Sequence, residues 1–225
     1  MDSLARIRKE VTSCVRCPRL VGWREEAAAN PPARFAGQTY WARPLPGWGD
    51  PKARLLILGL APAAHGGNRT GRIFTGDRSG DWLFRALHKA GYANQPSSIS
   101  QSDGLKLSDA YIAAIVRCAP PTNKPLPQER DNCLEYTVRE LGVLKNVGAI
   151  MALGSFAWDG ALRAASALGH SARPKPKFSH GAVVRVGPWH LVGCYHPSQQ
   201  NTFTGTLTEA MLDQVVQSAK QLSQR

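Results

Sequence analysis

Four of the five cysteines have a spacing that suits a single thiolate site. Cys14 and Cys17 form a C-x2-C pair, and Cys118 and Cys133 follow one hundred residues later as C-x14-C. Four thiolates hold either zinc or an iron–sulfur cluster, so the number of ligands does not distinguish the two. Four core cysteines without a metal are the alternative, which the polar, basic surroundings of the first pair (CVRCPRL) disfavour. Cys194 lies inside an apolar run and is typical of a small buried hydrophobe.

A glycine-rich segment, residues 59–77 (GLAPAAHGGNRTGRIFTGD), is the second candidate for chemistry. Its glycines would let the backbone approach a flat or anionic ligand closely. Phe74 is its only aromatic carbocycle, and its polar side chains include Asn68, Arg69, Arg72 and Asp77. The spacing matches neither a Walker A loop nor a dinucleotide fingerprint. A generic α/β loop is therefore the alternative.

The third candidate is His196, which follows an apolar run and opens the polar segment HPSQQN. A strand that delivers a histidine into a polar loop is a common way to present a general acid or an electrophile at the end of a sheet. A hydrogen-bonded surface histidine is the alternative.

The hydrophobic pattern places these segments in an α/β fold. The expected strands are residues 54–60, 111–116 and 148–153, followed by paired strands at 182–186 and 189–195. The expected helices are residues 3–15, 81–91, 128–145, 155–168 (capped by Ser155) and 209–223, whereas 22–53 are expected to be irregular. This alternation predicts a three-layer α/β/α sandwich with a central, mostly parallel four-stranded sheet. Ligands bind at the carboxyl ends of parallel strands, which predicts a site at residues 61–80 and 196–208.

The net charge of the chain indicates its class of partner, and its apolar runs indicate whether it spans a membrane. The 225 residues include 28 Lys and Arg against 16 Asp and Glu, which gives a net charge of +12 and a pI near 9.9. Such an excess favours a polyanionic partner, most commonly a nucleic acid. No apolar run approaches the roughly 18 residues of a membrane span, and residues 1–10 are polar and charged. We therefore expect neither a membrane protein nor a secreted one.

Four motifs occur here in the order found in bacterial and archaeal uracil-DNA glycosylases. They are CVRCPRL, GLAPAAHGGNRTGRIFTGD, VRCAPPTNKPLPQERDNC and HPSQQNT, and they extend from Cys14 to Asn201. More narrowly, the chain resembles the family 5 (UDGb-type), iron–sulfur-containing enzymes. The resemblance implies one α/β/α glycosylase domain over residues 1–225 with an N-terminal cluster-binding segment. It also implies a structural 4Fe–4S cluster held by Cys14, Cys17, Cys118 and Cys133.

Two alanines depart from the uracil-specific members of the superfamily. Those members place an Asp or Asn two residues after the first glycine of the glycine-rich motif, where it positions the attacking water, but here the position is Ala61. Ala114 likewise replaces the asparagine of family 4-like members, four residues before Cys118. The resemblance therefore implies a roomier pocket that accepts hypoxanthine and xanthine as well as uracil.

The chemistry assigns roles to the remaining residues. Phe74 would stack the extruded base, and His196 would donate to a carbonyl oxygen of the departing base. Asp77 would activate water or stabilise the sugar cation, unless it only caps the following helix or pairs with an arginine. Asn123 and Asn201 would read base edges, and the backbone from Gly59 to Ala61 would line the pocket. The candidates for phosphate contacts are Arg69, Arg72, Arg173, Lys175 and Lys177, and those for a wedge that replaces the flipped base are Gln200 and Phe203.

Together these features predict a monofunctional DNA glycosylase of base excision repair that hydrolyses the N-glycosidic bond and leaves an abasic site. We expect a monomer that acts on duplex and single-stranded DNA in the cytoplasm of a bacterial or archaeal cell, associated with the nucleoid. A non-catalytic iron–sulfur protein that binds nucleic acid is the alternative. It would explain the charge and the cysteines but would leave His196 and Phe74 without a role.

Overall fold

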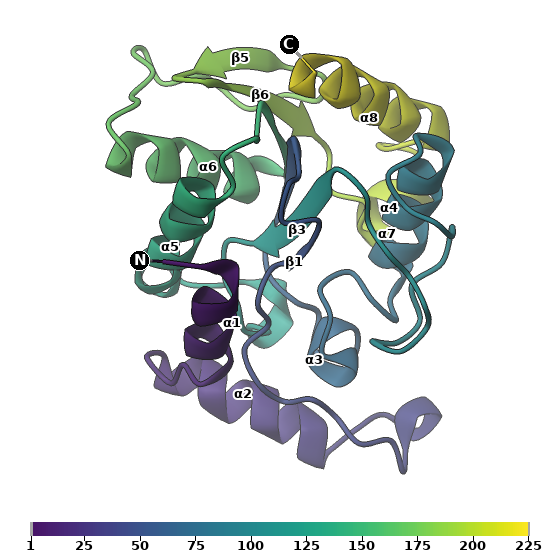
Figure 1. The fold of residues 1–225 in the computed structure, drawn as a ribbon. Helices are drawn as coiled ribbons and strands as arrows, with labels where there is room; N and C mark the ends of the chain where they lie inside the picture. The colour runs from purple at the N-terminus through teal and green to yellow at the C-terminus, as the bar shows by residue number, and fades with distance from the viewer. Residues whose placement is uncertain (1, 225) are drawn as a thin grey trace.

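A computed structural model describes residues 2–224 as a six-stranded mixed sheet with helices on both faces (Figure 1). The strand order is β1-β3-β2-β4-β6-β5. The four central strands run parallel, and β1 and β5 add antiparallel edges. The strands are β1 (Trp48–Gly49), β2 (Leu55–Gly59), β3 (Ala110–Ala114), β4 (Ala149–Leu153), β5 (Val183–Val186) and β6 (Trp189–Cys194). The predicted α/β class is confirmed, but the predicted number of four strands is wrong.

Eight α-helices and two 3-10 turns complete the described part of the chain. The helices are α1 (Leu4–Thr12), α2 (Pro18–Ala29), α3 (Gly67–Thr70), α4 (Arg78–Lys89), α5 (Pro127–Val143), α6 (Ser155–Ala167), α7 (Gln199–Phe203) and α8 (Glu209–Ser223). The 3-10 turns are η1 (Ala33–Phe35) and η2 (Pro121–Asn123). Across residues 2–224, the length and apolar content of every helix fall short of what a membrane crossing needs.

The alternation of side chains along the buried strands produces the three layers. Leu55 and Ile57 of β2 face a core formed with α4 and α8, whereas Leu56 and Leu58 face a core formed with α5 and α6. Figure 1 shows these two helix pairs on opposite sides of the sheet. Both faces of β2 are therefore covered, which is why its sequence is continuously apolar.

The N-terminal third differs most from the sequence prediction. Residues 22–53 were expected to be irregular, but they contain most of α2 as well as η1 and β1. The buried positions of α2 are Leu20, Arg24 and Ala27, so a charged residue occupies the middle of its buried stripe and hides the helical pattern. The predicted cap of α6 is also wrong, because the helix begins at Ser155 and Gly154 is its N-cap.

A buried ion pair joins the end of β3 to α5. Arg117 and Glu140 are each 1% exposed, and two guanidinium nitrogens donate to the two carboxylate oxygens at 2.5 and 3.1 Å. Thr137 accepts a further hydrogen bond from Arg117. Removal of one partner would leave the other as a buried, uncompensated charge.

We therefore expect Glu140→Gln to lower the free energy of unfolding by about 3–5 kcal/mol. The control is Glu135→Gln, on the same helix. Its carboxylate is about half exposed and pairs with Arg16 at 2.7 Å and with Arg139 at 3.4 Å, so its loss should cost at most about 1 kcal/mol. Urea unfolding followed by circular dichroism measures both changes. Equal losses for the two variants would contradict the role assigned to the buried pair.

Candidate active site

The predicted site residues gather where the parallel strands end. Gly59, the last residue of β2, lies opposite Ala114, the last residue of β3. The pairing continues beyond both strands, because the Val116 amide donates to the Leu60 carbonyl at 3.0 Å. Ala61 follows directly, and its side chain packs toward the apolar cluster that contains Cys118. Ala61 thus lies beside the cysteine site, whereas Ala114 belongs to the core beneath α4 and α8.

Phe74 is held in a strained conformation against two glycines. Its φ is +56°, a left-handed value that a bulky residue rarely adopts. A Cβ added to Gly59 would lie 2.8 Å from the Phe74 ring, and a Cβ added to Gly80 would lie 2.1 Å from the Phe74 carbonyl oxygen. Only glycine fits at either position. The surrounding backbone thus fixes both the ring and the main chain of Phe74.

Asp77 caps helix α4. Its Oδ1 accepts a hydrogen bond from the Gly80 amide at 3.0 Å, and its Oδ2 lies against Gly66, where a Cβ would approach it to 2.1 Å. Burial raises the pKa of Asp77, while the Gly80 amide opposes this increase. Neither Arg69 nor Arg72 forms an ion pair with it among the described residues. The capping alternative is confirmed, and a catalytic role stays a prediction.

His196 lies next to Phe74. The two ring centroids are 5.9 Å apart with an angle of 34° between the planes. Burial lowers the pKa of His196 to about 4, so the imidazole is neutral at pH 7. A neutral imidazole has one N–H donor and one acceptor nitrogen. The pair therefore combines an aromatic face with a neutral hydrogen-bond donor.

The two candidate asparagines have different environments. Asn201 donates from its amide nitrogen to the His196 carbonyl at 2.8 Å, so it braces the backbone that carries the histidine. Asn123 is exposed at the end of η2 with φ +56°. The structure supports a positioning role for Asn201, and base reading by either residue stays a prediction.

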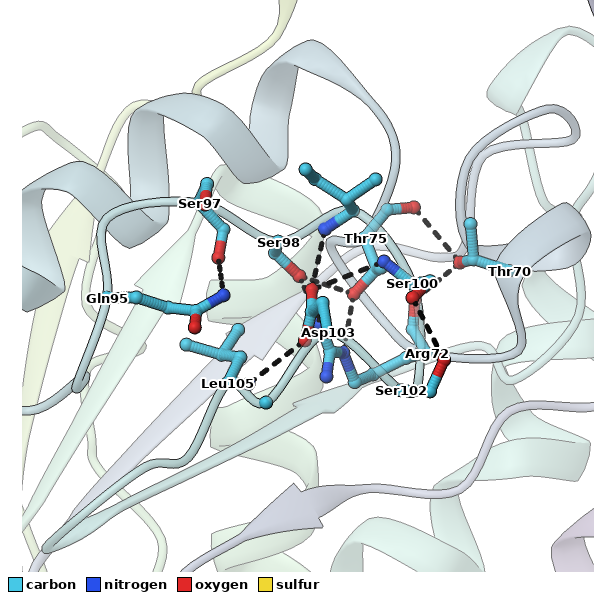
Figure 2. Close-up of polar contacts among 12 residues, drawn as sticks. Thr70, Arg72, Thr75, Gln95, Ser97, Ser98, Ser100, Ser102, Asp103 and Leu105 are labelled. Atoms are coloured by element: carbon cyan, nitrogen blue, oxygen red, sulfur yellow. Dashed lines mark hydrogen bonds and ion pairs between the residues drawn. The ribbon is translucent and has the colours of Figure 1, made fainter.

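Arg72 is an interior residue that clamps the glycine-rich segment to the loop 95–105 (Figure 2). It is 8% exposed, and its guanidinium donates to Asp103 at 2.6 Å, to Ser98 at 2.8 Å and to Thr75 at 2.9 Å. These bonds hold in place the short stretch of chain that runs from the strained Phe74 to Asp77. The burial of Arg72 argues against its predicted contact with DNA.

Asp103 is the positioning residue that sequence reasoning missed. Besides Arg72, it accepts hydrogen bonds from the amides of Ile99, Ser100 and Leu105. Burial alone would raise the pKa of Asp103, but the hydrogen bonds from Arg72 and from these three amides lower it to about 2. It lies in a polar segment about thirty residues after Arg72, and no local pattern links the two.

Arg69 also braces the loop, but part of its side chain is exposed to solvent. It donates to the carbonyl oxygens of His65 and Gly76 and to the side chain of Gln38. Lys175, another predicted phosphate contact, forms an ion pair with Asp159.

The four predicted cysteine ligands border one small cavity, as the spacing suggested. Cys14 and Cys17 come from the turn between α1 and α2, Cys118 follows β3, and Cys133 lies on α5. Arg24 and Asn132 donate to the sulfurs of Cys118 and Cys17, both at 3.4 Å. Burial raises the pKa of Cys118 to about 12 and that of Cys133 to about 11. These two thiols would therefore stay protonated without a cation beside them.

The thiols surround this cavity and do not converge on a point. Within residues 2–224, no three His, Cys, Asp or Glu side chains lie close enough to hold one metal ion. Cys194 lies apart from the other four in the core beneath α8, so its predicted role as a buried hydrophobe is confirmed.

Comparisons with known proteins identify the family of this chain. Residues 46–220 match the model of the uracil DNA glycosylase superfamily. Proteins named type-5 uracil-DNA glycosylase are 53% identical in Mycobacterium bovis (98% of this chain, 82% of that one) and 50% identical in Thermus thermophilus (95% of each). A type-4 enzyme of Archaeoglobus fulgidus is 29% identical over 70% of this chain and 62% of its own. The chain therefore belongs to the uracil-DNA glycosylase superfamily and, within it, to the type-5 enzymes.

Proposed function

We propose that this protein is a monofunctional DNA glycosylase that hydrolyses the N-glycosidic bond of uracil in DNA and leaves an abasic site. The observation that carries the proposal is the grouping of Phe74, Asp77 and His196 at the carboxyl ends of the parallel strands, in a chain of this family. Base excision repair is the process that uses this reaction, and the named relatives come from bacteria and an archaeon.

The first step is to bring the base out of the helix. Unstacking costs a few kcal/mol, which a complementary aromatic surface can offset. Phe74 supplies such a surface, and the missing side chains of Gly59 and Gly80 leave space for its ring and its carbonyl group. Phe203 supports the wedge prediction, since it is 66% exposed on the short helix after His196.

The second step separates charge between the sugar and the base. The departing base gains negative charge, and a neutral His196 can donate a hydrogen bond to its carbonyl oxygen. A neutral donor adds no positive charge beside the sugar cation. Asp77 supplies the negative charge that stabilises this cation or orients the attacking water.

The breadth of the substrate range follows from the small residues near Gly59. Ala114 lies opposite Gly59, and Ala61 lies two residues beyond it, so neither position carries a polar group that would select uracil. We extend the proposal to hypoxanthine and xanthine on this basis.

We also propose that Cys14, Cys17, Cys118 and Cys133 hold a 4Fe–4S cluster, because all four line one cavity. The N–H donors of Arg24 and Asn132 suit anionic thiolates. Bound there, the cluster would cross-link the N-terminal helices to β3 and α5. One domain with an N-terminal cluster-binding segment stays a prediction.

The test of the function is single-turnover cleavage of duplexes that contain uracil, hypoxanthine or xanthine. We expect His196→Ala to lower the rate roughly 100-fold or more, because its donor acts chiefly as charge develops on the base, while the affinity for duplex is retained. His88→Ala, an exposed histidine on α4, is the control and should cleave normally. A wild-type protein that binds duplex but releases no base would favour the non-catalytic alternative.

Asp77→Asn separates catalysis from helix capping. Asparagine caps a helix about as well as aspartate, so the melting temperature should change little. Loss of the carboxylate should still lower the single-turnover rate roughly 100-fold, as removal of one electrostatic group does in other enzymes. Asp77→Ala should lose both the rate and about 1 kcal/mol of stability. A normal rate for Asp77→Asn would leave Asp77 with capping alone.

The cofactor proposal predicts colour. The purified protein should absorb in the visible range through sulfur-to-iron charge transfer, and Cys17→Ser should remove this absorbance. Cys194→Ser is the matched control and should leave the spectrum unchanged, because Cys194 lies in a separate core. A colourless wild-type protein with stoichiometric zinc would contradict the cluster.

A further inference from the structure

The arginines of this protein differ in the side chains that they contact. Most are neutralised by a carboxylate within 4 Å, including the aromatic-stacked Arg16, Arg72 and Arg85. Four others stack on an aromatic ring and have no acidic partner among residues 2–224. They are Arg34 and Arg69 on Phe35, Arg43 on Trp41 and Arg78 on Phe203, at 4.2–5.9 Å from the ring centroids. We call these four the arginine arc.

Printed contacts connect the first three members of the arc. Arg34 and Arg69 share the ring of Phe35. Arg43 stacks on the ring of Trp41, and the backbone amide of Trp41 donates to the Arg69 carbonyl at 3.0 Å. The turn η1, the irregular residues 41–43 and helix α3 thus meet at one group of positive charges.

The fourth member continues the arc to the active site. The Arg69 guanidinium donates to the Gly76 carbonyl at 3.0 Å, and Arg78 follows two residues later, directly after Asp77. Its partner Phe203 belongs to α7, which begins after His196. The arc therefore runs from η1 along the glycine-rich segment to the two catalytic candidates.

The local charge is positive along this path. Burial, together with the guanidiniums of Arg34 and Arg69, lowers the pKa of His65, whose ring lies 6.2 Å from that of Phe35. Arg34, Arg43 and Arg78 are exposed. A guanidinium that rests on an aromatic face keeps its N–H edge free for phosphate oxygens and loses less freedom on binding.

We propose that Arg34, Arg43 and Arg78, the exposed members of the arginine arc, bind phosphates of one DNA strand and guide the damaged nucleotide toward Phe74 and His196. This proposal rests on the proposed function for the identity of the polyanion. In this proposal Arg34, Arg43 and Arg78 contact phosphates, and the buried Arg72 does not. Ion-paired arginines elsewhere contribute to the net charge of +12 but not to this surface.

The test measures the salt dependence of DNA binding with a fluorescent duplex that carries a stable abasic analogue. The variant combines Arg34→Gln, Arg43→Gln and Arg78→Gln, and leaves out Arg69 because it also braces the loop. The control combines Arg6→Gln, Arg54→Gln and Arg163→Gln, which removes the same charge from exposed but ion-paired arginines. Anisotropy titrations between about 50 and 200 mM salt give the slope of log K against log salt.

Each lost phosphate contact should reduce this slope by about 0.9, so the arc variant should lose roughly 2.7 and the control variant less than 1. The corresponding triple lysine variant of the arc keeps the charge and should retain most of the slope. Circular dichroism confirms folding, and Arg34→Gln alone, with an expected loss of about 0.9, serves if the triple variant is unstable. Equal losses in the arc and control variants, or an unchanged slope in the arc variant, would overturn the proposal.

Uracil release by the wild-type protein separates this result from the proposed function. Salt-dependent binding through the arc without base release would leave the arc valid and the glycosylase proposal wrong. Base release with an unchanged slope in the arc variant would leave the glycosylase proposal valid and the arc proposal wrong.

Discussion

The buried ion pair between Arg72 and Asp103 is the constraint on which the geometry of the site depends. An ion pair removed from water contributes little net stability, but it strongly penalises any arrangement that separates the partners. Here it joins two loops that have no regular structure of their own (Figure 2). The neighbouring Phe74 is strained by about 1–3 kcal/mol, a cost that persists only where the surroundings determine the backbone completely. The clamp supplies that determination.

The glycines complete what the clamp begins. Gly59 and Gly80 admit the ring and the carbonyl of Phe74, and Gly66 admits the carboxylate of Asp77. The glycine-rich segment was expected to bring its backbone close to a ligand. Gly59 and Gly66 of this segment, and Gly80 just after it, also bring the catalytic candidates close to the backbone. A side chain at any of the three positions would displace a residue of the site.

The sequence predicts the layers and the location of the site, because both depend on local patterns. Buried strands are continuously apolar, and the loops at their carboxyl ends carry the polar residues. Helix α2 escaped prediction because Arg24 occupies its buried stripe and donates to Cys118, a contact that is specified only by tertiary structure. The burial of Arg72 escaped for the same reason. An arginine with a distant acidic partner cannot be distinguished by its neighbours in sequence from one that faces solvent.

Burial also shapes the electrostatics of the site. Burial favours the neutral form of both titratable candidates, since it raises the pKa of Asp77 and lowers that of His196. His196 gains from this effect, because a neutral donor suits the departing base. Asp77 needs a compensating interaction, and the Gly80 amide at the start of α4 provides one. The capping bond and the proposed catalytic role of Asp77 are therefore compatible. The bond that begins the helix also favours the charged form of a carboxylate that burial would otherwise neutralise.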